Sequence, residues 1–162
     1  MTKLTAERLR EDVHYNPETG AFTRARRTSN RINVGDVAGT VGAYGYVRFH
    51  AAGKLYPAHR LAWLYCFGAF PAGEIDHING DKTDNRISNL RLSSRSLNLQ
   101  NQRKARATNK LGVLGVSPQK GRFKAQIQYG GKKRHIGMFE TKEEAYAAYV
   151  SEKRKHHEAC TI

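Results

Sequence analysis

The longest uninterrupted apolar run in this chain extends only from Leu61 to Phe67, and Gly68 and Pro71 end it. A membrane-spanning helix needs about 20 consecutive apolar residues, so we expect no membrane partner. In a chain of 162 residues, apolar segments this short can fill one or two small cores but not one large core. The 8 Tyr, 6 Phe and 1 Trp still supply enough large apolar side chains for a folded protein.

The positive charge is concentrated in one part of the chain. There are 28 Lys and Arg against 14 Asp and Glu, a net charge of +14, yet no acidic residue occurs between Asn85 and Phe139. Such a segment favours a polyanion, because neutralising phosphates releases their counterions. A solvated basic face or contact with an anionic membrane is the alternative, but no amphipathic lipid-binding helix accompanies the charge.

The N-terminal segment and the cysteines indicate the compartment. Residues 1–8 lack the apolar stretch of a secretory signal, and the two cysteines lie nearly 100 positions apart, so they form no disulfide framework. We therefore predict a cytoplasmic protein.

Local patterns predict the elements of the N-terminal half. Helical spacing, with Thr5 as N-cap, predicts a helix over 4–13. A β-hairpin is expected over 39–57, with residues 44–49 as its first strand and Ala52–Gly53 as its turn, followed by a helix over 59–67. A strand at 74–77, a loop at 79–85, a strand at 90–92 and a polar helix over 94–102 then make a β-loop-β-helix unit.

The pattern changes after this unit. Residues 103–110 carry charge without apolar periodicity, which predicts a linker. From Phe123 to Tyr129 apolar and polar residues alternate, the next two glycines signal a hairpin turn, and residues 134–139 form the returning strand. Thr141 and Glu144 make a capping box that predicts a helix, and its apolar stripe should pack on the sheet.

The most specific pattern extends from Asp76 to Asn98. It reads Asp76-His77-Ile78-Asn79-Gly80-Asp81, then Asn85-Arg86-Ile87-Ser88-Asn89-Leu90-Arg91, then Asn98. With these motifs, residues 4–102 resemble the HNH endonucleases, most closely the phage-type homing and nicking enzymes. The segment His59-Arg60-Leu61-Ala62-Trp63 is similar to the one that precedes the motif in that group. Many members have His at the position of Asn98, so this chain resembles the H-N-N subgroup.

The same residues suit phosphodiester hydrolysis, which needs an activated water and a cation on the scissile phosphate. Imidazole can deprotonate water near neutral pH, so His77 is predicted as the general base. Asp76 and Asn98 offer hard oxygen ligands for one Mg²⁺ or Mn²⁺. The resemblance implies that Asn89 holds the loop and orients His77. No structural zinc is expected, because the sequence has no Cys-x-x-Cys pair.

The C-terminal residues carry a second resemblance. Gly115-Val116, residues 121–127 and residues 136–149 are similar to the Apetala/ethylene-response-factor DNA-binding domain, which places a three-stranded sheet in the major groove. The resemblance covers about residues 112–157. It implies DNA contacts from Ser117, Gln119, Arg122, Gln126, Gln128, Lys133 and His135, and the polar strand face adds Lys124. The plant pattern has Arg at positions 117 and 119 and Trp at 135, so its target sequence does not carry over.

These observations predict an α+β protein with two modules. A ββα-metal (His-Me finger) HNH nuclease domain over 1–102, with its core motif at 73–102, is followed by a basic linker over 103–111. A small three-stranded antiparallel sheet with one helix occupies 112–162. Further DNA contacts are expected from basic residues in and after the motif: Arg86, Arg91, Arg95, Arg103, Lys104 and Arg106.

The predicted function is metal-dependent hydrolysis of double-stranded DNA by a monomer that nicks one strand. The resemblance implies a homing endonuclease encoded by a phage or mobile element in a bacterial host. A non-catalytic, sequence-specific DNA-binding regulator is the main alternative. An RNA-binding or structural basic protein is a third, and it is disfavoured because Phe123 and Tyr129 fall on the expected core face rather than on an exposed stacking face.

Overall fold

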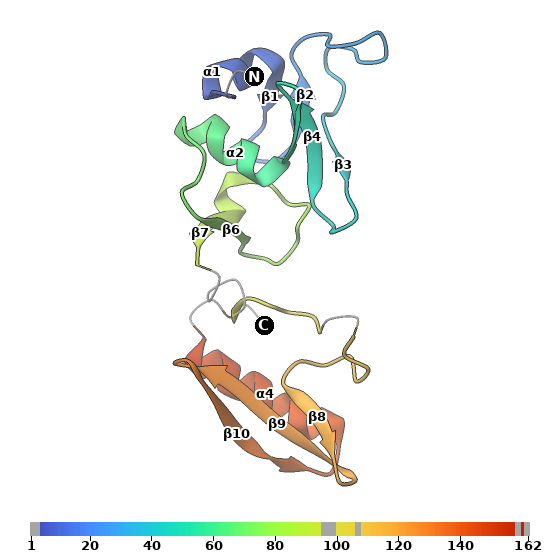
Figure 1. Cartoon of the computed structure of the whole chain (residues 1–162), viewed down its shortest axis with the longest axis vertical. Coiled ribbons are helices and arrows are strands. Elements are labelled where there is room, and N and C mark those ends of the chain that lie inside the picture. Colours follow the sequence, from blue (N-terminus) through green and yellow to red (C-terminus); the bar gives the residue numbers. More distant parts are fainter. Residues whose placement is uncertain (1–3, 95–99, 106–107, 158–159, 161–162) are drawn as a thin grey trace. The chain divides into compact units, whose positions relative to one another are not determined.

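The structure is a computed structural model that describes residues 4–94, 100–105, 108–157 and 160. These residues form a mixed α/β structure with three α-helices and four small antiparallel sheets. The chain divides into two compact units, Met1–Ser94 and Arg95–Ile162 (Figure 1). The domain limits expected at residues 102 and 112 stay predictions.

The first unit is built from short elements. In chain order these are α1 (Ala6–Asp12), β1 (Val13–Tyr15), β2 (Phe22–Arg24), β3 (Thr40–Val41), β4 (Val47–Ala51), β5 (Lys54–Pro57), α2 (Ala58–Phe67), β6 (Glu74–His77), the 3-10 helix η1 (Ile87–Asn89) and β7 (Leu90–Ser93). Strand β1 pairs with β2, β4 lies between β3 and β5, and β6 pairs with β7.

The two helices of this unit lie near the predicted ranges, but α1 is shorter at both ends because Val13 already begins β1, and α2 begins one residue earlier, at Ala58. Thr5 caps α1, since its hydroxyl oxygen accepts a hydrogen bond from the amide of Arg8. Gly68 ends α2 in the left-handed conformation that glycine adopts without strain. Leu9 and Leu61 have no exposed surface and share one core with Phe22 and the other apolar side chains of this unit. Ile75 of β6 and Leu90 of β7 belong to this core, which anchors the β6–β7 hairpin.

The expected hairpin over 39–57 is correct in outline but wrong at its start. The strand predicted from Tyr44 begins only at Val47, because the residues before it form a tight turn between β3 and β4. That turn is closed by the amide of Gly45, which donates to the Gly42 carbonyl oxygen, and Gly45 has a φ of 81°. The alternation of Tyr44 to Phe49 in the sequence imitates a strand, but the positive φ needed at Gly45 favours a turn.

The β-loop-β part of the predicted unit is confirmed. Strands β6 and β7 are antiparallel, with Asp76 opposite Arg91 and His77 opposite Leu90. The helix expected over 94–102 would follow β7, and residues 95–99 of it lie outside the described residues.

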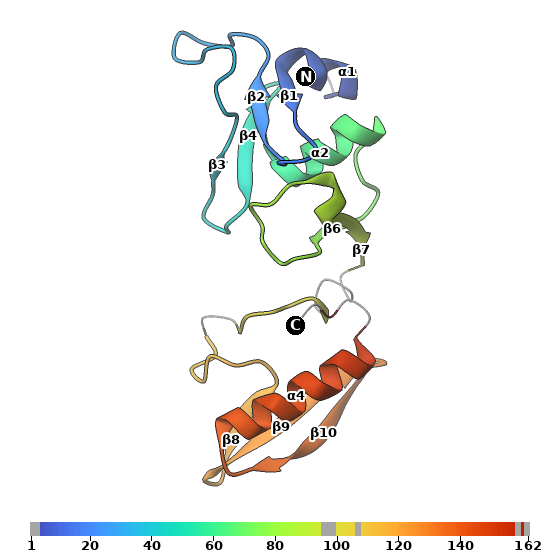
Figure 2. The same cartoon turned by 180° about the vertical axis from the view of Figure 1, so that it is seen from behind.

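The second unit is a three-stranded sheet covered by one helix. Its elements are β8 (Val116–Gln119), β9 (Arg122–Tyr129), β10 (Lys132–Phe139) and α4 (Lys142–His156), with β9 in the middle of the sheet. The capping box of Thr141 and Glu144 is confirmed. Helix α4 lies along one face of the sheet (Figures 1 and 2), where Ala125 and Ala145 are fully buried. Within this unit the buried Lys153 donates a hydrogen bond to the carbonyl oxygen of Gln102.

Among the described helices, none has both the length and the apolarity that a membrane span requires.

The close packing of Gly115 against Tyr149 gives a stability prediction. A Cβ at residue 115 would clash with the Tyr149 ring, whereas a Cβ at Gly121 would meet no atom within 4 Å. Both glycines have positive φ, 69° and 77°, so alanine at either position carries a similar backbone penalty of about 1 kcal/mol. We expect Gly115→Ala to lower the free energy of unfolding by about 1 to 3 kcal/mol more than Gly121→Ala, because the added methyl group overpacks against the Tyr149 ring.

Hydrogen exchange of the β9 and β10 amides in the full chain measures this difference. Equal protection in the two alanine variants would contradict the packing described here.

Candidate active site

The loop between β6 and β7 is folded around the side chain of Asn89. Its Oδ1 accepts a hydrogen bond from the Asn79 amide at 2.9 Å. Its Nδ2 donates to Asn79 Oδ1 at 3.0 Å and to the Asp84 carbonyl oxygen at 2.9 Å. Asn89 is 6% exposed, so these bonds replace water that the buried amide has lost. The loop is thereby held at both of its ends, next to His77.

The His77 side chain lies in a buried position, with 4% of the residue exposed. Its Nε2 is 3.2 Å from Asn85 Oδ1, and its ring lies 5.2 Å from the His59 ring and 5.9 Å from the Tyr46 ring. Burial lowers the pKa of His77 below its usual value of 6.5, although the Asn85 hydrogen bond and nearby carboxylates oppose this shift. His77 is therefore neutral at pH 7, as a general base must be.

The contact with Asn85 determines which ring nitrogen of His77 can accept a proton. Asn85 Nδ2 donates to the Thr83 carbonyl oxygen at 3.0 Å, so the atom facing His77 is the acceptor Oδ1. Nε2 of the neutral ring must then carry the hydrogen, which leaves the lone pair on Nδ1. Nδ1 is thus the basic atom of this histidine.

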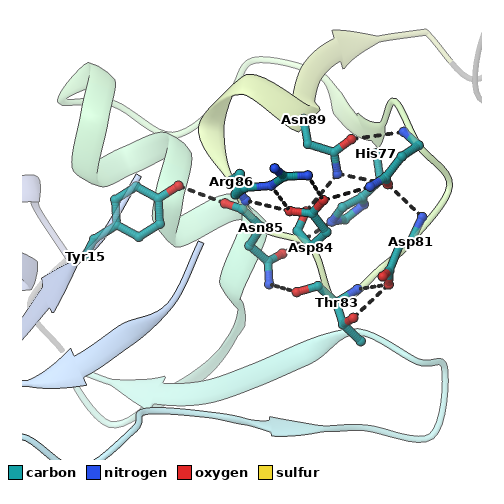
Figure 3. Close-up of polar contacts among 9 residues, drawn as sticks. Tyr15, His77, Asp81, Thr83, Asp84, Asn85, Arg86 and Asn89 are labelled. Carbon is teal, nitrogen blue, oxygen red and sulfur yellow. Dashed lines mark hydrogen bonds and ion pairs between the residues drawn. The ribbon is translucent and has the colours of Figure 1, made fainter. Parts of the chain in front are cut away.

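Asn85 is itself fixed by the N-terminal hairpin. Its carbonyl oxygen accepts a buried hydrogen bond from the Tyr15 hydroxyl at 2.8 Å, and Figure 3 shows Tyr15 reaching it from the β1 side. A Cβ at Gly20, in the turn between β1 and β2, would clash with the backbone of Asn85 and Arg86. Sequence reasoning missed Asn85, which is 2% exposed. In the sequence Asn85 is one of several asparagines in the motif, and nothing in the local pattern indicates its contact with His77.

His59, the second residue of α2, belongs to the same cluster. It is 9% exposed, and its Nδ1 has no hydrogen-bond partner among the described residues. Burial, reinforced by His77, lowers the pKa of His59 to about 4. A neutral His59 therefore packs edge-on against the His77 ring without adding a positive charge beside it.

The predicted metal ligand Asp76 adjoins His77 but makes a different contact. Asp76 Oδ2 accepts two hydrogen bonds from the Arg91 guanidinium, at 2.8 Å and 3.1 Å. A carboxylate is a hard oxygen donor suited to Mg²⁺, so Asp76 fits a divalent cation chemically. Among the described residues no three His, Cys, Asp or Glu side chains form a metal-binding group. The other predicted ligand, Asn98, lies outside the described residues.

The remaining predicted phosphate-binding residues near the loop differ in their surroundings. Arg86 forms a two-point ion pair with Asp84 and holds the pKa of Asp84 at about 2. Arg91 is engaged by Asp76 as described, and Lys104 is exposed. Arg103 is half-buried in the second unit. Two further residues of this group, Arg95 and Arg106, lie outside the described residues.

Strand register brings the predicted DNA-contacting residues of the second unit onto one face of its sheet. In β8 and β9, Ser117 lies opposite Lys124 and Gln119 opposite Arg122. In β9 and β10, Gln126 lies opposite His135 and Gln128 opposite Lys133. Directly opposed residues share a face, and this face is the one away from α4. We call these eight residues the polar sheet face. Arg122 also pairs with Glu140 at 2.8 Å, but both side chains are exposed, so the pair can exchange with a ligand.

Comparison with known proteins finds one family match, and it includes the loop. Residues 56–100 match the family model of the HNH endonucleases, a segment that includes α2, β6, η1 and β7. This match supports an HNH nuclease, a class of phosphodiester hydrolases that act on DNA and generally use a divalent metal ion. No curated protein and no solved structure matches the chain.

Loss of the Tyr15 hydroxyl should loosen the position of Asn85 in the site. Tyr15→Phe leaves the Asn85 carbonyl oxygen buried without its donor, which costs about 1 to 3 kcal/mol. We expect lower stability and lower nuclease activity, because Asn85 then holds His77 less firmly. Tyr56→Phe is the matched control, since the partly buried Tyr56 stacks on Phe70 and its hydroxyl has no partner among the described residues. Denaturation and DNA cleavage by both variants test the link, and equal behaviour of the two would contradict it.

Acid should destabilise the first unit through His59. In the folded chain the pKa of His59 is about 4, against 6.5 for an exposed histidine. Between these pH values the unfolded chain therefore binds more protons than the folded chain. His59 therefore favours unfolding as the pH falls below about 6.5, and the free energy of unfolding is lowered by about 2 kcal/mol at pH 5. The groups facing His59 are His77, Tyr46 and Arg60.

The variant His59→Phe removes this titration. We expect its unfolding free energy to fall less than that of the wild type between about pH 7.5 and pH 5, as measured by chemical denaturation. Parallel pH profiles for the two proteins would refute this role of His59.

Proposed function

We propose that this chain is a metal-dependent HNH endonuclease that hydrolyses phosphodiester bonds in double-stranded DNA. The observation that carries the proposal is the buried, neutral His77, whose Nε2 is held by Asn85 within the segment that matches the HNH family. The H-N-N resemblance favours an enzyme of the homing type that acts as a monomer and nicks one strand. It also favours a phage or mobile element in a bacterial host as the origin.

His77 acts as the general base in this proposal. Its Nδ1 takes a proton from the attacking water, and Asn85 stabilises the resulting imidazolium because its Oδ1 accepts from the Nε2 hydrogen. The fixed loop around Asn89 keeps the imidazole oriented throughout the reaction. A general base of this kind contributes about 10²- to 10⁴-fold to the rate.

Asp76 and the predicted ligand Asn98 would hold a divalent cation, Mg²⁺ or Mn²⁺. When bound, the cation supplies charge stabilisation at the scissile phosphate and at the departing 3′ oxygen. Arg91 offers a second positive charge at this place, since its guanidinium lies against Asp76. The products expected from this chemistry are a 5′ phosphate and a 3′ hydroxyl.

The second unit is proposed to help choose the target. Its polar sheet face presents side chains that can bond to base edges and phosphates, and α4 leaves that face uncovered. The same feature suits a non-catalytic DNA-binding regulator, which remains the second candidate.

Conversion of supercoiled plasmid to open-circle or linear DNA tests the proposal. We expect conversion with Mg²⁺ or Mn²⁺, no conversion with EDTA, and a loss of at least about 100-fold in His77→Ala. The matched control is His14→Ala, because His14 is exposed on β1. An open-circle product that DNA ligase reseals without kinase treatment would support nicking with 5′ phosphate ends. Binding without metal-dependent cleavage, on DNA that contains the target, would favour the regulator.

A further inference from the structure

The turn between β3 and β4 presents an unusually exposed aromatic side chain. Tyr44 is 79% exposed, and its ring has no partner among the described residues. The turn that carries it is rigid, since the Gly42 amide donates to the Tyr46 carbonyl oxygen at 2.9 Å and the Gly45 amide donates to the Gly42 carbonyl oxygen at 2.8 Å. A tyrosine held on such a turn can offer an apolar ring and a hydroxyl to another molecule.

This turn is attached to the loop of the candidate active site. Lys82 Nζ donates to the Tyr44 carbonyl oxygen at 3.0 Å and lies over the Tyr46 ring at 4.7 Å. The Tyr46 ring in turn contacts the His77 ring. Figure 3 shows the β3–β4 hairpin passing beside the labelled Asp81 and Thr83. The turn that carries Tyr44 is thus linked to His77 through Lys82 and Tyr46.

Two cationic side chains, Lys82 and Arg48, contact the turn that carries the exposed ring. The Arg48 guanidinium lies against the backbone of Gly42, where a Cβ would clash with it. Neither Arg48 nor Lys82 forms an ion pair with a described residue. An exposed aromatic ring together with cations that have no carboxylate partner is a combination that binds sugar, base and phosphate.

We propose that Tyr44 and Arg48 form a DNA-contact element that binds the duplex beside the scissile phosphate. The Tyr44 ring packs against a sugar or base, and Arg48 binds a backbone phosphate of the flanking duplex. This inference rests on the proposed nuclease function and extends it, because it assigns DNA contacts to the N-terminal part of the chain and not only to the basic stretch after Asn85.

Binding of the full chain to a DNA duplex in EDTA tests the proposal separately from cleavage. We expect Tyr44→Ala to raise Kd about tenfold, as loss of one aromatic–nucleotide contact does. Arg48→Gln should lower the slope of log K against log salt by about one, the signature of one lost phosphate contact. Phe67→Ala is the matched control, because Phe67 is another exposed aromatic residue of the same unit, 59% exposed at the end of α2. It should bind like the wild type.

Photochemical crosslinking provides a second readout that does not depend on affinity. Benzoylphenylalanine in place of Tyr44 should crosslink to the duplex, and the same substitution at Phe67 should not. Wild-type binding by both Tyr44→Ala and Arg48→Gln, with no crosslink from position 44, would overturn the proposal. That result leaves the proposed nuclease intact if the wild type cleaves plasmid, whereas failure of the nuclease proposal would appear as an uncleaved plasmid.

Discussion

Three polar side chains, His77, Asn85 and Asn89, are buried together in the first unit, and their need for hydrogen bonds organises what surrounds them. An unpaired polar group in such a place costs several times what a normal hydrogen bond contributes. The Asn89 side chain is satisfied only if the loop closes on it, and the Asn85 side chain only if Thr83 and His77 reach it. Tyr15 satisfies the main-chain carbonyl oxygen of Asn85. The N-terminal hairpin, the loop and the two strands of the motif are therefore folded as one structure.

This arrangement also sets the chemistry of His77. Burial keeps the imidazole neutral and the Asn85 contact selects its tautomer, so the ring is ready to accept a proton at one atom. Two of the three carboxylates that act on the ring are paired, Asp76 with Arg91 and Asp84 with Arg86. Such pairing limits the carboxylate field at the ring, which would otherwise raise its pKa.

Features specified by neighbouring residues could be predicted from the sequence. The Thr5 cap, the capping box at Thr141 and the alternating strand after Phe123 follow from local rules, and the structure has all three. The eight residues of the polar sheet face followed from a resemblance and from period-two alternation, and strand register places them together.

What could not be predicted depends on contacts between distant parts of the chain. Asn85 gains its role from Tyr15, 70 positions earlier, and from the turn at Gly20. His59 faces His77 only because α2 packs behind the hairpin. Tyr44 was assigned to a strand because its neighbours alternate, and one glycine φ decided otherwise. Each of these errors arose where tertiary contacts or a single backbone angle outweighed a local pattern.

The most direct test of the central claim is the protonation state of the two His77 ring nitrogens near neutral pH, measured by ¹⁵N NMR. The spectrum of the histidine-labelled full chain can be assigned with His77→Gln. A hydrogen on Nε2 and none on Nδ1 is the predicted result, since Asn85 Oδ1 accepts from Nε2. A hydrogen on Nδ1 at this pH, in either the neutral or the charged ring, would contradict the assignment of His77 Nδ1 as the base.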